Sequence, residues 1–148
     1  LSLKHYSAYK QIIDQELPYA LIIEDDSVFC YDFMNKMQEI IQVLPLEWDV
    51  YFPNSTHTMF QMDSIPIEEN NFISKRAHPA TAYTISYLIK KSTCENVVSE
   101  IEKNKIALPI DHELNHIFYK HNCNVYFNKT SPLITCANFP SSVQNQTI

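Results

Sequence analysis

Apolar residues recur at helical spacing in two stretches near the start of the chain. The first stretch precedes Pro18, and its apolar face is made up of Leu3, Tyr6, Tyr9 (or the stem of Lys10) and Ile13. The second stretch follows Asp32 and carries a stripe at i, i+4, i+7, i+8 and i+11: Phe33, Met37, Ile40, Ile41 and Leu44. We therefore predict one helix over residues 2–16 and a second, capped by Asp32, that ends before Pro45.

Short apolar runs predict the strands. The run Tyr19–Glu24 lies between Pro18 and a group of acids, and its continuous apolar character predicts a buried strand. Further strands are predicted at residues 48–52, 72–73, 81–85 (continuing toward residue 88) and 125–127. Residues 53–71 lack any period and predict a long loop, and the tail from Thr130 is mostly polar and irregular.

Two more helices are predicted in the second half of the chain. The tetrad Ser92-Thr93-Cys94-Glu95 has the form of a capping box, which predicts a helix from Ser92 to about Asn104. Asp111 follows Pro109 and is predicted to cap a helix that ends at about Lys120. Strands and helices thus alternate, which favours an α/β sandwich with a largely parallel sheet, in a single domain over residues 1–148.

Composition narrows the function classes. The net charge of −6 argues against general nucleic-acid binding, and no apolar run reaches the roughly 18 residues of a membrane span. Glycine is absent, so the chain contains neither a Walker phosphate loop nor a Rossmann fingerprint. A bound phosphate must therefore be held by a metal ion, by side chains or by a helix N-terminus.

The four cysteines are widely separated, and no Cys-x-x-Cys pair occurs. A zinc ribbon is therefore not expected, and buried reduced thiols are the simpler interpretation. Three glycosylation sequons begin at Asn54, Asn128 and Asn145, but short sequons arise by chance in a chain rich in Asn, Ser and Thr. They do not establish secretion.

Three acids, Glu24, Asp25 and Asp26, directly follow the first predicted strand. Carboxylates this close repel one another, and Mg²⁺ or Mn²⁺ relieves that repulsion because hard cations prefer carboxylate oxygens. In an extended segment Glu24 and Asp26 would point the same way. We therefore predict a cation that holds a diphosphate at this strand end, where open α/β sheets bind ligands. The alternative is an ordinary acidic loop.

A second group has metal-ligand spacing: His112, Glu113 and His116 form a literal H-E-x-x-H. On a helix the two histidines lie one turn apart and could share a zinc ion, with the glutamate as general base. A third ligand is required, yet no Asp or Glu follows Glu113. A zinc hydrolase is therefore kept only as an alternative, beside a chance match on a polar helix face.

Several segments, taken in order, resemble family-25 glycosyltransferases, which include lipooligosaccharide galactosyltransferases and collagen galactosyltransferase domains. The segment YALIIEDDSVF (residues 19–29) is similar to the most typical motif of that family. The other similar segments are residues 1–13, 48–52, 81–86, 108–111, 131–134 and 141–143. The resemblance thus covers nearly the whole chain.

This resemblance implies a GT-A-like, Rossmann-type sandwich and inverting transfer of a hexose, galactose or glucose, from a nucleotide sugar. A UDP-sugar donor and a glycan or protein acceptor are implied, as in lipopolysaccharide biosynthesis. Asp26 and Glu24 would bind Mn²⁺ (or Mg²⁺), and Glu24 and Asp25 would contact the cofactor and its diphosphate. Asp111 matches the P-x-D acid of the family and would be the general base; its competing role is that of helix cap.

Family members usually begin with a strand and an arginine-rich segment upstream of the first helix, and this first strand region has no counterpart here. The resemblance is therefore to an N-terminally truncated member, either a fragment or a shortened relative. A degenerate, non-catalytic sugar-binding domain is the third alternative. We expect a cytoplasmic protein, with a viral or ER-lumenal origin also open.

Overall fold

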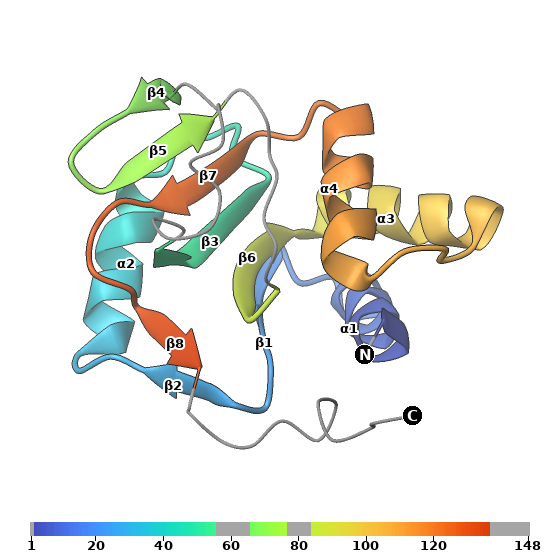
Figure 1. Ribbon diagram of the computed structural model, residues 1–148, viewed down its shortest axis with the longest axis horizontal. Coiled ribbons are helices and arrows are strands. Elements are labelled where there is room, and N and C mark those ends of the chain that lie inside the picture. Colours follow the sequence, from blue (N-terminus) through green and yellow to red (C-terminus); the bar gives the residue numbers. More distant parts are fainter. Residues whose placement is uncertain (1, 56–65, 77–83, 137–148) are drawn as a thin grey trace, which may run out of the picture.

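A computed structural model of the chain describes residues 2–55, 66–76 and 84–136 (Figure 1). These residues form four helices: α1 (Ser2–Asp14), α2 (Phe33–Val43), α3 (Lys91–Asn104) and α4 (Ile110–Lys120). They also form eight strands: β1 (Tyr19–Ile23), β2 (Ser27–Phe29), β3 (Val50–Ser55), β4 (Pro66–Glu69), β5 (Ile73–Arg76), β6 (Ser86–Lys90), β7 (Val125–Asn128) and β8 (Ile134–Cys136). The predicted α/β class is confirmed.

Six strands form one sheet in the order β1-β6-β3-β7-β5-β4, and β2 pairs with β8 in a separate two-stranded sheet. Within the larger sheet only β3 and β7 pair in parallel, whereas the other four neighbouring pairs are antiparallel. The prediction of a largely parallel sheet is therefore wrong. The alternation of strands and helices could not reveal that β6 enters antiparallel between β1 and β3, which themselves run in the same direction.

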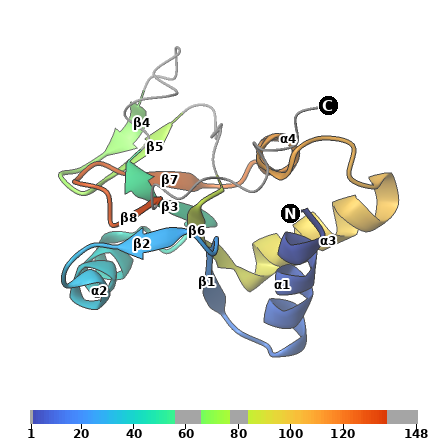
Figure 2. The same ribbon diagram turned by 60° about the horizontal axis from the view of Figure 1, so that its bottom comes forward.

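Helices cover both faces of this sheet. Figures 1 and 2 show α1, α3 and α4 gathered on one side and α2 on the other. Strand β3 supplies both layers, because Val50 and Phe52 pack with the three-helix group while Tyr51 packs with α2. All three side chains are fully buried, and burial of each large apolar side chain contributes about 1.5–3 kcal/mol. The apolar run of β3 thus fits a central strand.

Strand β1 lies at the edge of the sheet and pairs only with β6. The prediction that it is buried is wrong, because its three central residues are half-buried and Tyr19 and Ile23 are 41% and 44% exposed. Helix α1 covers one face of β1, where Ala20 and Ile22 pack against the first core cluster, the hydrophobic core that α1, α3 and α4 form with the sheet. A continuous apolar run does not distinguish this half-covered edge from a central strand.

All four predicted helices are present, but of the predicted caps at Asp32, Ser92 and Asp111 only Asp32 occupies an N-cap position. Helix α3 begins at Lys91 after Lys90, and the Ser92 capping box does not form. Helix α4 begins after Pro109, so Asp111 lies in its first turn instead of at the cap position. Asp32 does occupy the N-cap position of α2, yet its carboxylate accepts a hydrogen bond from the Asn35 side chain and none from the helix backbone.

The predicted apolar face of α1 is confirmed in part, because Tyr9 is buried and Tyr6 and Ile13 pack against the core, whereas Leu3 is 75% exposed. The buried stripe consists of His5, Tyr9 and Ile12 at i, i+4 and i+7, and the histidine was not predicted to belong to it. This stripe places His5 toward the end of β1.

The strand boundaries agree in part with the sequence analysis. Strands β3, β5 and β7 overlap the predicted runs, and β6 (Ser86–Lys90) overlaps only the continuation toward residue 88 of the strand predicted at residues 81–85. Residues 81–83 of that prediction lie outside the described residues. Strand β4 falls within the predicted long loop, β8 within the predicted irregular tail, and β2 was not predicted.

Cysteines, sequons and hydropathy add three observations. All four cysteines are free, as predicted, but only Cys94 is buried and Cys136 is exposed. Asn54 and Asn128 are 8% and 3% exposed, so the asparagines of these two sequons are buried; Asn145 is outside the described residues. No helix in residues 2–55, 66–76 and 84–136 has the length and apolar character needed to cross a membrane.

Candidate functional site

The three acids follow β1 in a tight turn at the edge of the sheet. The backbone N–H of Ser27 donates to the carbonyl of Glu24 (3.2 Å), and the N–H of Glu24 donates to the carbonyl of Ile85 (2.9 Å). Their predicted position directly after the strand is therefore confirmed. The expectation of an extended segment is wrong, because this turn replaces the alternation of a strand from Asp25 onward.

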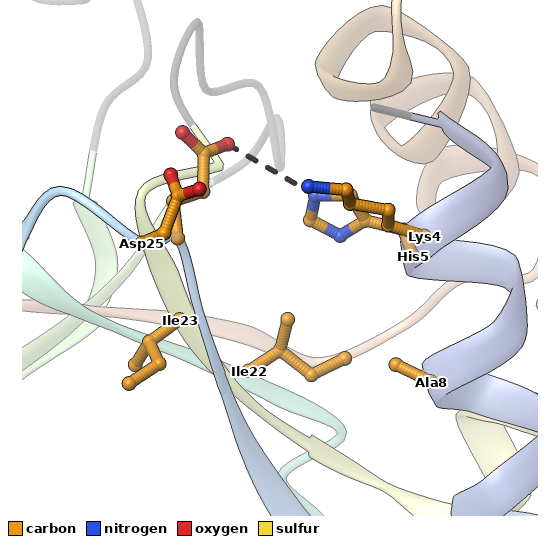
Figure 3. A pocket seen from close by; sticks show the side chains of 7 residues that line it. Lys4, His5, Ala8, Ile22, Ile23 and Asp25 are labelled. Carbon is orange, nitrogen blue, oxygen red and sulfur yellow. Dashed lines mark ion pairs between the residues drawn. The ribbon is translucent and has the colours of Figure 1, made fainter.

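Glu24 receives polar contacts from two directions. The Thr84 hydroxyl donates a hydrogen bond of 3.0 Å to Oε1 of Glu24, and Nε2 of His5 lies 3.9 Å from the same oxygen. The Glu24 side chain is 23% exposed, so these contacts are shielded from most of the solvent. Figure 3 shows His5 on α1 facing the carboxylates across a pocket.

The pocket lies between α1 and the end of β1 and has a volume of about 190 Å³. Its lining residues are Lys4, His5, Ala8, Ile22, Ile23, Glu24 and Asp25. Ala8 and Ile22 give it an apolar wall, and the charged groups stand at its other side (Figure 3). Ligand pockets usually measure roughly 300–1,000 Å³, so this space accommodates only part of a ligand as large as a nucleotide sugar.

Asp26 has a buried carboxylate oxygen without a partner. Its Oδ1 accepts no hydrogen bond within the described part of the chain. A buried acceptor left unsatisfied costs about 1–3 kcal/mol, and more when it is charged. A divalent cation would remove that cost, which makes Asp26 the residue that most directly fits a bound metal ion.

The described residues contain no group of three or more His, Cys, Asp or Glu side chains arranged to hold a metal ion. Mg²⁺ and Mn²⁺ need fewer protein ligands when they are bound with a phosphate, because one or two carboxylates suffice and phosphate oxygens and water complete the coordination. A cation at the acid turn would therefore share its coordination with a ligand, because the described residues do not form a closed, all-protein cage.

Cys136 lies beside the acids, a proximity that no local sequence pattern indicated. Strand β8 pairs with β2 so that Cys136 faces Ser27, the residue after the acids. Burial, followed by the negative charges of Asp26 and Glu24, raises the pKa of the Cys136 thiol. The thiol therefore stays protonated near neutral pH and adds no further charge to the site.

His5 belongs to a buried polar cluster that the sequence analysis missed. Its Nδ1 lies 2.7 Å from the Tyr87 hydroxyl, its ring stacks on the Tyr87 ring, and the Tyr87 hydroxyl is hydrogen-bonded to that of Tyr9. Burial lowers the pKa of His5 and raises that of Tyr87. His5 is therefore neutral at pH 7. The i, i+4, i+7 spacing of His5, Tyr9 and Ile12 was the available signal.

Asp111 is half-buried in the first turn of α4, and its Oδ1 accepts a hydrogen bond from the backbone N–H of His112 (2.9 Å). No side-chain cap bond is present at the start of this helix, so the structural role predicted for Asp111 is not the one it has. The contacts given by the described residues do not connect Asp111 with Glu24, Asp25 or Asp26.

The H-E-x-x-H group does not form a metal site in the described structure. Glu113 Oε2 accepts hydrogen bonds from the backbone N–H groups of Ala107 (3.3 Å) and Leu108 (3.1 Å), while His112 and His116 are exposed. The motif thus lies on the polar face of a helix whose glutamate holds the preceding loop. The geometry does not support the zinc-hydrolase alternative.

Comparisons with known proteins bear on the acid motif and its surroundings. The sequence model of glycosyltransferase family 25 (LPS biosynthesis protein) matches residues 2–114, and this range includes α1, the acid turn and the start of α4. The chain therefore belongs to glycosyltransferase family 25.

Curated relatives are similar over most of the chain. Procollagen galactosyltransferase 2 of Homo sapiens is 27% identical over 123 residues, which cover 80% of this chain and 19% of the relative. The Mus musculus protein of the same name is 25% identical over 122 residues, with the same coverage. Procollagen galactosyltransferase 1 of Danio rerio is 23% identical over 129 residues, 85% of this chain and 21% of the relative. The chain thus spans about a fifth of the length of these relatives.

Proposed function

We propose that the chain is, or is part of, a metal-dependent glycosyltransferase that moves a hexose from a nucleotide sugar to an acceptor hydroxyl. The observation that carries this proposal is the buried Oδ1 of Asp26, which has no hydrogen-bond partner among the described residues, two positions after Glu24 in a member of glycosyltransferase family 25. The names of the relatives favour galactose as the sugar and a protein as acceptor, with a glycan as the alternative. A UDP-sugar is the proposed donor.

The proposed cation is Mn²⁺ (or Mg²⁺), bound by Asp26 and Glu24 together with the donor diphosphate. When bound, it supplies positive charge that stabilises the departing diphosphate. Asp25 is exposed at the edge of the pocket, where it contributes negative charge that attracts the cation. In this proposal Asp26 and Glu24 keep the metal-binding roles that the family resemblance implies.

Asp111 is the proposed general base. Its carboxylate would accept the proton of the acceptor hydroxyl as that oxygen attacks the anomeric carbon and the nucleoside diphosphate leaves from the opposite face, which inverts the configuration. The first turn of α4 is a favourable place for a carboxylate, because the helix dipole stabilises negative charge there. Oδ1 of Asp111 accepts a hydrogen bond from the backbone N–H of His112.

A calorimetric titration tests the proposal. The 148-residue chain is titrated with Mn²⁺ in the presence of UDP-galactose or UDP-glucose, and the same titration is made on Asp26→Asn, which keeps the shape but removes the charge. We expect binding by the wild type and its loss in the variant. Asp32→Asn is the matched control, because Asp32 is an exposed acid whose side chain bonds only Asn35 in the described structure.

Three results would change the conclusion. Absence of Mn²⁺-dependent binding to any nucleotide sugar would remove the proposed function. Binding without sugar transfer to any acceptor would favour the sugar-binding alternative. Stoichiometric zinc that is lost in His116→Ala would restore the hydrolase alternative.

We also propose a cytoplasmic location, which the four free cysteines support because disulfides are rare in that compartment.

A further inference from the structure

One oxygen of Glu24 is fixed by groups that are remote in sequence. Thr84, which precedes β6, donates its hydroxyl proton to Oε1, and His5, on α1, approaches the same atom. Both Thr84 and His5 are only 4% exposed, so their side chains have little freedom to turn away. Oε2 of Glu24 receives no hydrogen bond from the described residues, so one oxygen is held and the other is open to a ligand.

The two contacts differ in strength. The Thr84 contact of 3.0 Å is a full hydrogen bond, whereas the 3.9 Å between Nε2 of His5 and Oε1 exceeds hydrogen-bond length and leaves an electrostatic contact. Thr84 therefore sets the position of the carboxylate. His5 places an N–H dipole beside it.

The donor and acceptor capacities of the buried cluster give His5 a fixed orientation. A carboxylate can only accept, so the favourable tautomer of His5 carries its proton on Nε2, toward Glu24. Nδ1 then accepts from the Tyr87 hydroxyl, and the Tyr87 oxygen accepts from Tyr9. The O–H and N–H dipoles along this series of hydrogen bonds are thus directed toward the carboxylate. Successive hydrogen bonds of this kind strengthen one another in a low-dielectric interior.

We propose that Thr84 and His5, the latter oriented by Tyr87, are positioning residues that hold the Glu24 carboxylate in the orientation in which it binds the cation. This inference rests on the proposed function, because it takes Glu24 as a ligand. It adds α1 and the segment before β6 to the site, and it predicts that cation affinity depends on residues that do not touch the cation.

The experiment compares Mn²⁺ affinity, measured by calorimetry with UDP present, in the wild-type chain and in variants of Thr84, His5 and Tyr87. Thr84→Val removes the donor to Glu24 and keeps the β-branched shape, while Thr84→Ser keeps the hydroxyl. His5→Asn retains a polar group near the place of Nδ1 and removes the group that reaches Glu24. Tyr87→Phe releases Nδ1 of His5 without filling or emptying space, and it decides the role of His5 if His5→Asn does not fold.

Tyr51→Phe is the matched control for Tyr87→Phe. Both tyrosines are fully buried in the sheet, but the Tyr51 hydroxyl has no hydrogen-bond partner among the described residues and packs on the α2 face, away from α1. A general effect of the loss of a buried hydroxyl would appear in both variants. A positioning effect would appear only in Tyr87→Phe.

We expect Thr84→Val, His5→Asn and Tyr87→Phe to weaken Mn²⁺ binding by roughly 10–100-fold, the usual effect of removing a group that orients a metal ligand. Thr84→Ser and Tyr51→Phe should bind as the wild type does. Wild-type affinity in Thr84→Val, or in both His5→Asn and Tyr87→Phe, would overturn the inference and leave the proposed function intact. Failure of the wild type to bind Mn²⁺ would overturn both.

Discussion

The turn after β1 and the first half of α4 each carry three neighbouring groups able to bind a metal ion, yet their surroundings differ. Around the turn, contacts arrive from α1, from Thr84 and Ile85 before β6, and from β8. Around His112, Glu113 and His116 the glutamate bonds the adjacent loop, and both histidines are exposed. Among the described residues, contacts from distant parts of the chain converge on the turn, whereas the contacts of Glu113 come from the adjacent loop.

Substitutions in the two motifs should differ most in catalytic turnover. If Asp26 binds the cation, Asp26→Asn loses the several kcal/mol that a metal ion contributes to charge stabilisation, which corresponds to a decrease of roughly a thousandfold in turnover. His116→Asn should leave turnover unchanged, because His116 is exposed and belongs to no metal group in the described structure. Release of UDP from UDP-galactose, together with galactosylation of the acceptor, measures both. Equal losses in the two variants would contradict the comparison.

In α4 the buried face should matter for the free energy of unfolding, whereas the exposed face that carries the histidines should not. Leu114 is fully buried against the first core cluster, so Leu114→Ala should lower the free energy of unfolding by about 2–5 kcal/mol. His112→Ala, on the exposed face of the same helix, should change it by less than about 0.5 kcal/mol. Urea denaturation followed by circular dichroism measures both changes. A large loss in His112→Ala would show that the motif has a role that the described contacts do not give it.

Glu113 should have a smaller, purely local effect. Its carboxylate accepts two backbone hydrogen bonds from the loop before α4, so Glu113→Ala should reduce stability by about 1 kcal/mol. Glu113→Gln keeps an acceptor oxygen and should retain most of that stability. The free energy of unfolding from urea titrations distinguishes the two variants, and metal affinity should be unchanged in both. Loss of metal binding in Glu113→Gln would instead assign this glutamate to a site.

The sequence predicted the individual helices and strands better than it predicted which of them pack or pair with one another. The stripe from Phe33 to Leu44 predicted α2, and the position of the acids after β1 was correct, because both depend on local spacing. The antiparallel pairing of β6 with β1 and the contact of Thr84 with Glu24 join residues 60 to 71 positions apart in the chain, which periodicity does not report. His5 was missed because a histidine within an apolar stripe weakens that stripe's signal, although the helix buries it.

The ion pair between His121 and Glu100 gives the smallest expected effect. His121 lies near the H-E-x-x-H motif but, unlike His112 and His116 in the described structure, it has an acidic partner on another helix. Nε2 of His121 lies 3.0 Å from Oε1 of Glu100 on α3, and Nζ of Lys120 lies 2.8 Å from the other oxygen. The hydrogen bond from Lys120, and to a smaller extent that from His121, lowers the pKa of Glu100 to about 2. The contact joins the end of α4 to α3.

The sign of the pH effect follows from that shift. The folded-state pKa of Glu100 lies below its unfolded value, so its contribution to stability is present above about pH 4.5 and is lost as the pH falls toward 2. Glu100→Gln should therefore flatten the decrease in melting temperature between pH 5 and pH 2 while it lowers the melting temperature slightly at pH 7. Glu39→Gln, an exposed acid on α2, is the control. An unchanged acid profile in Glu100→Gln would mean that solvent screens this pair and that packing alone joins α4 to α3.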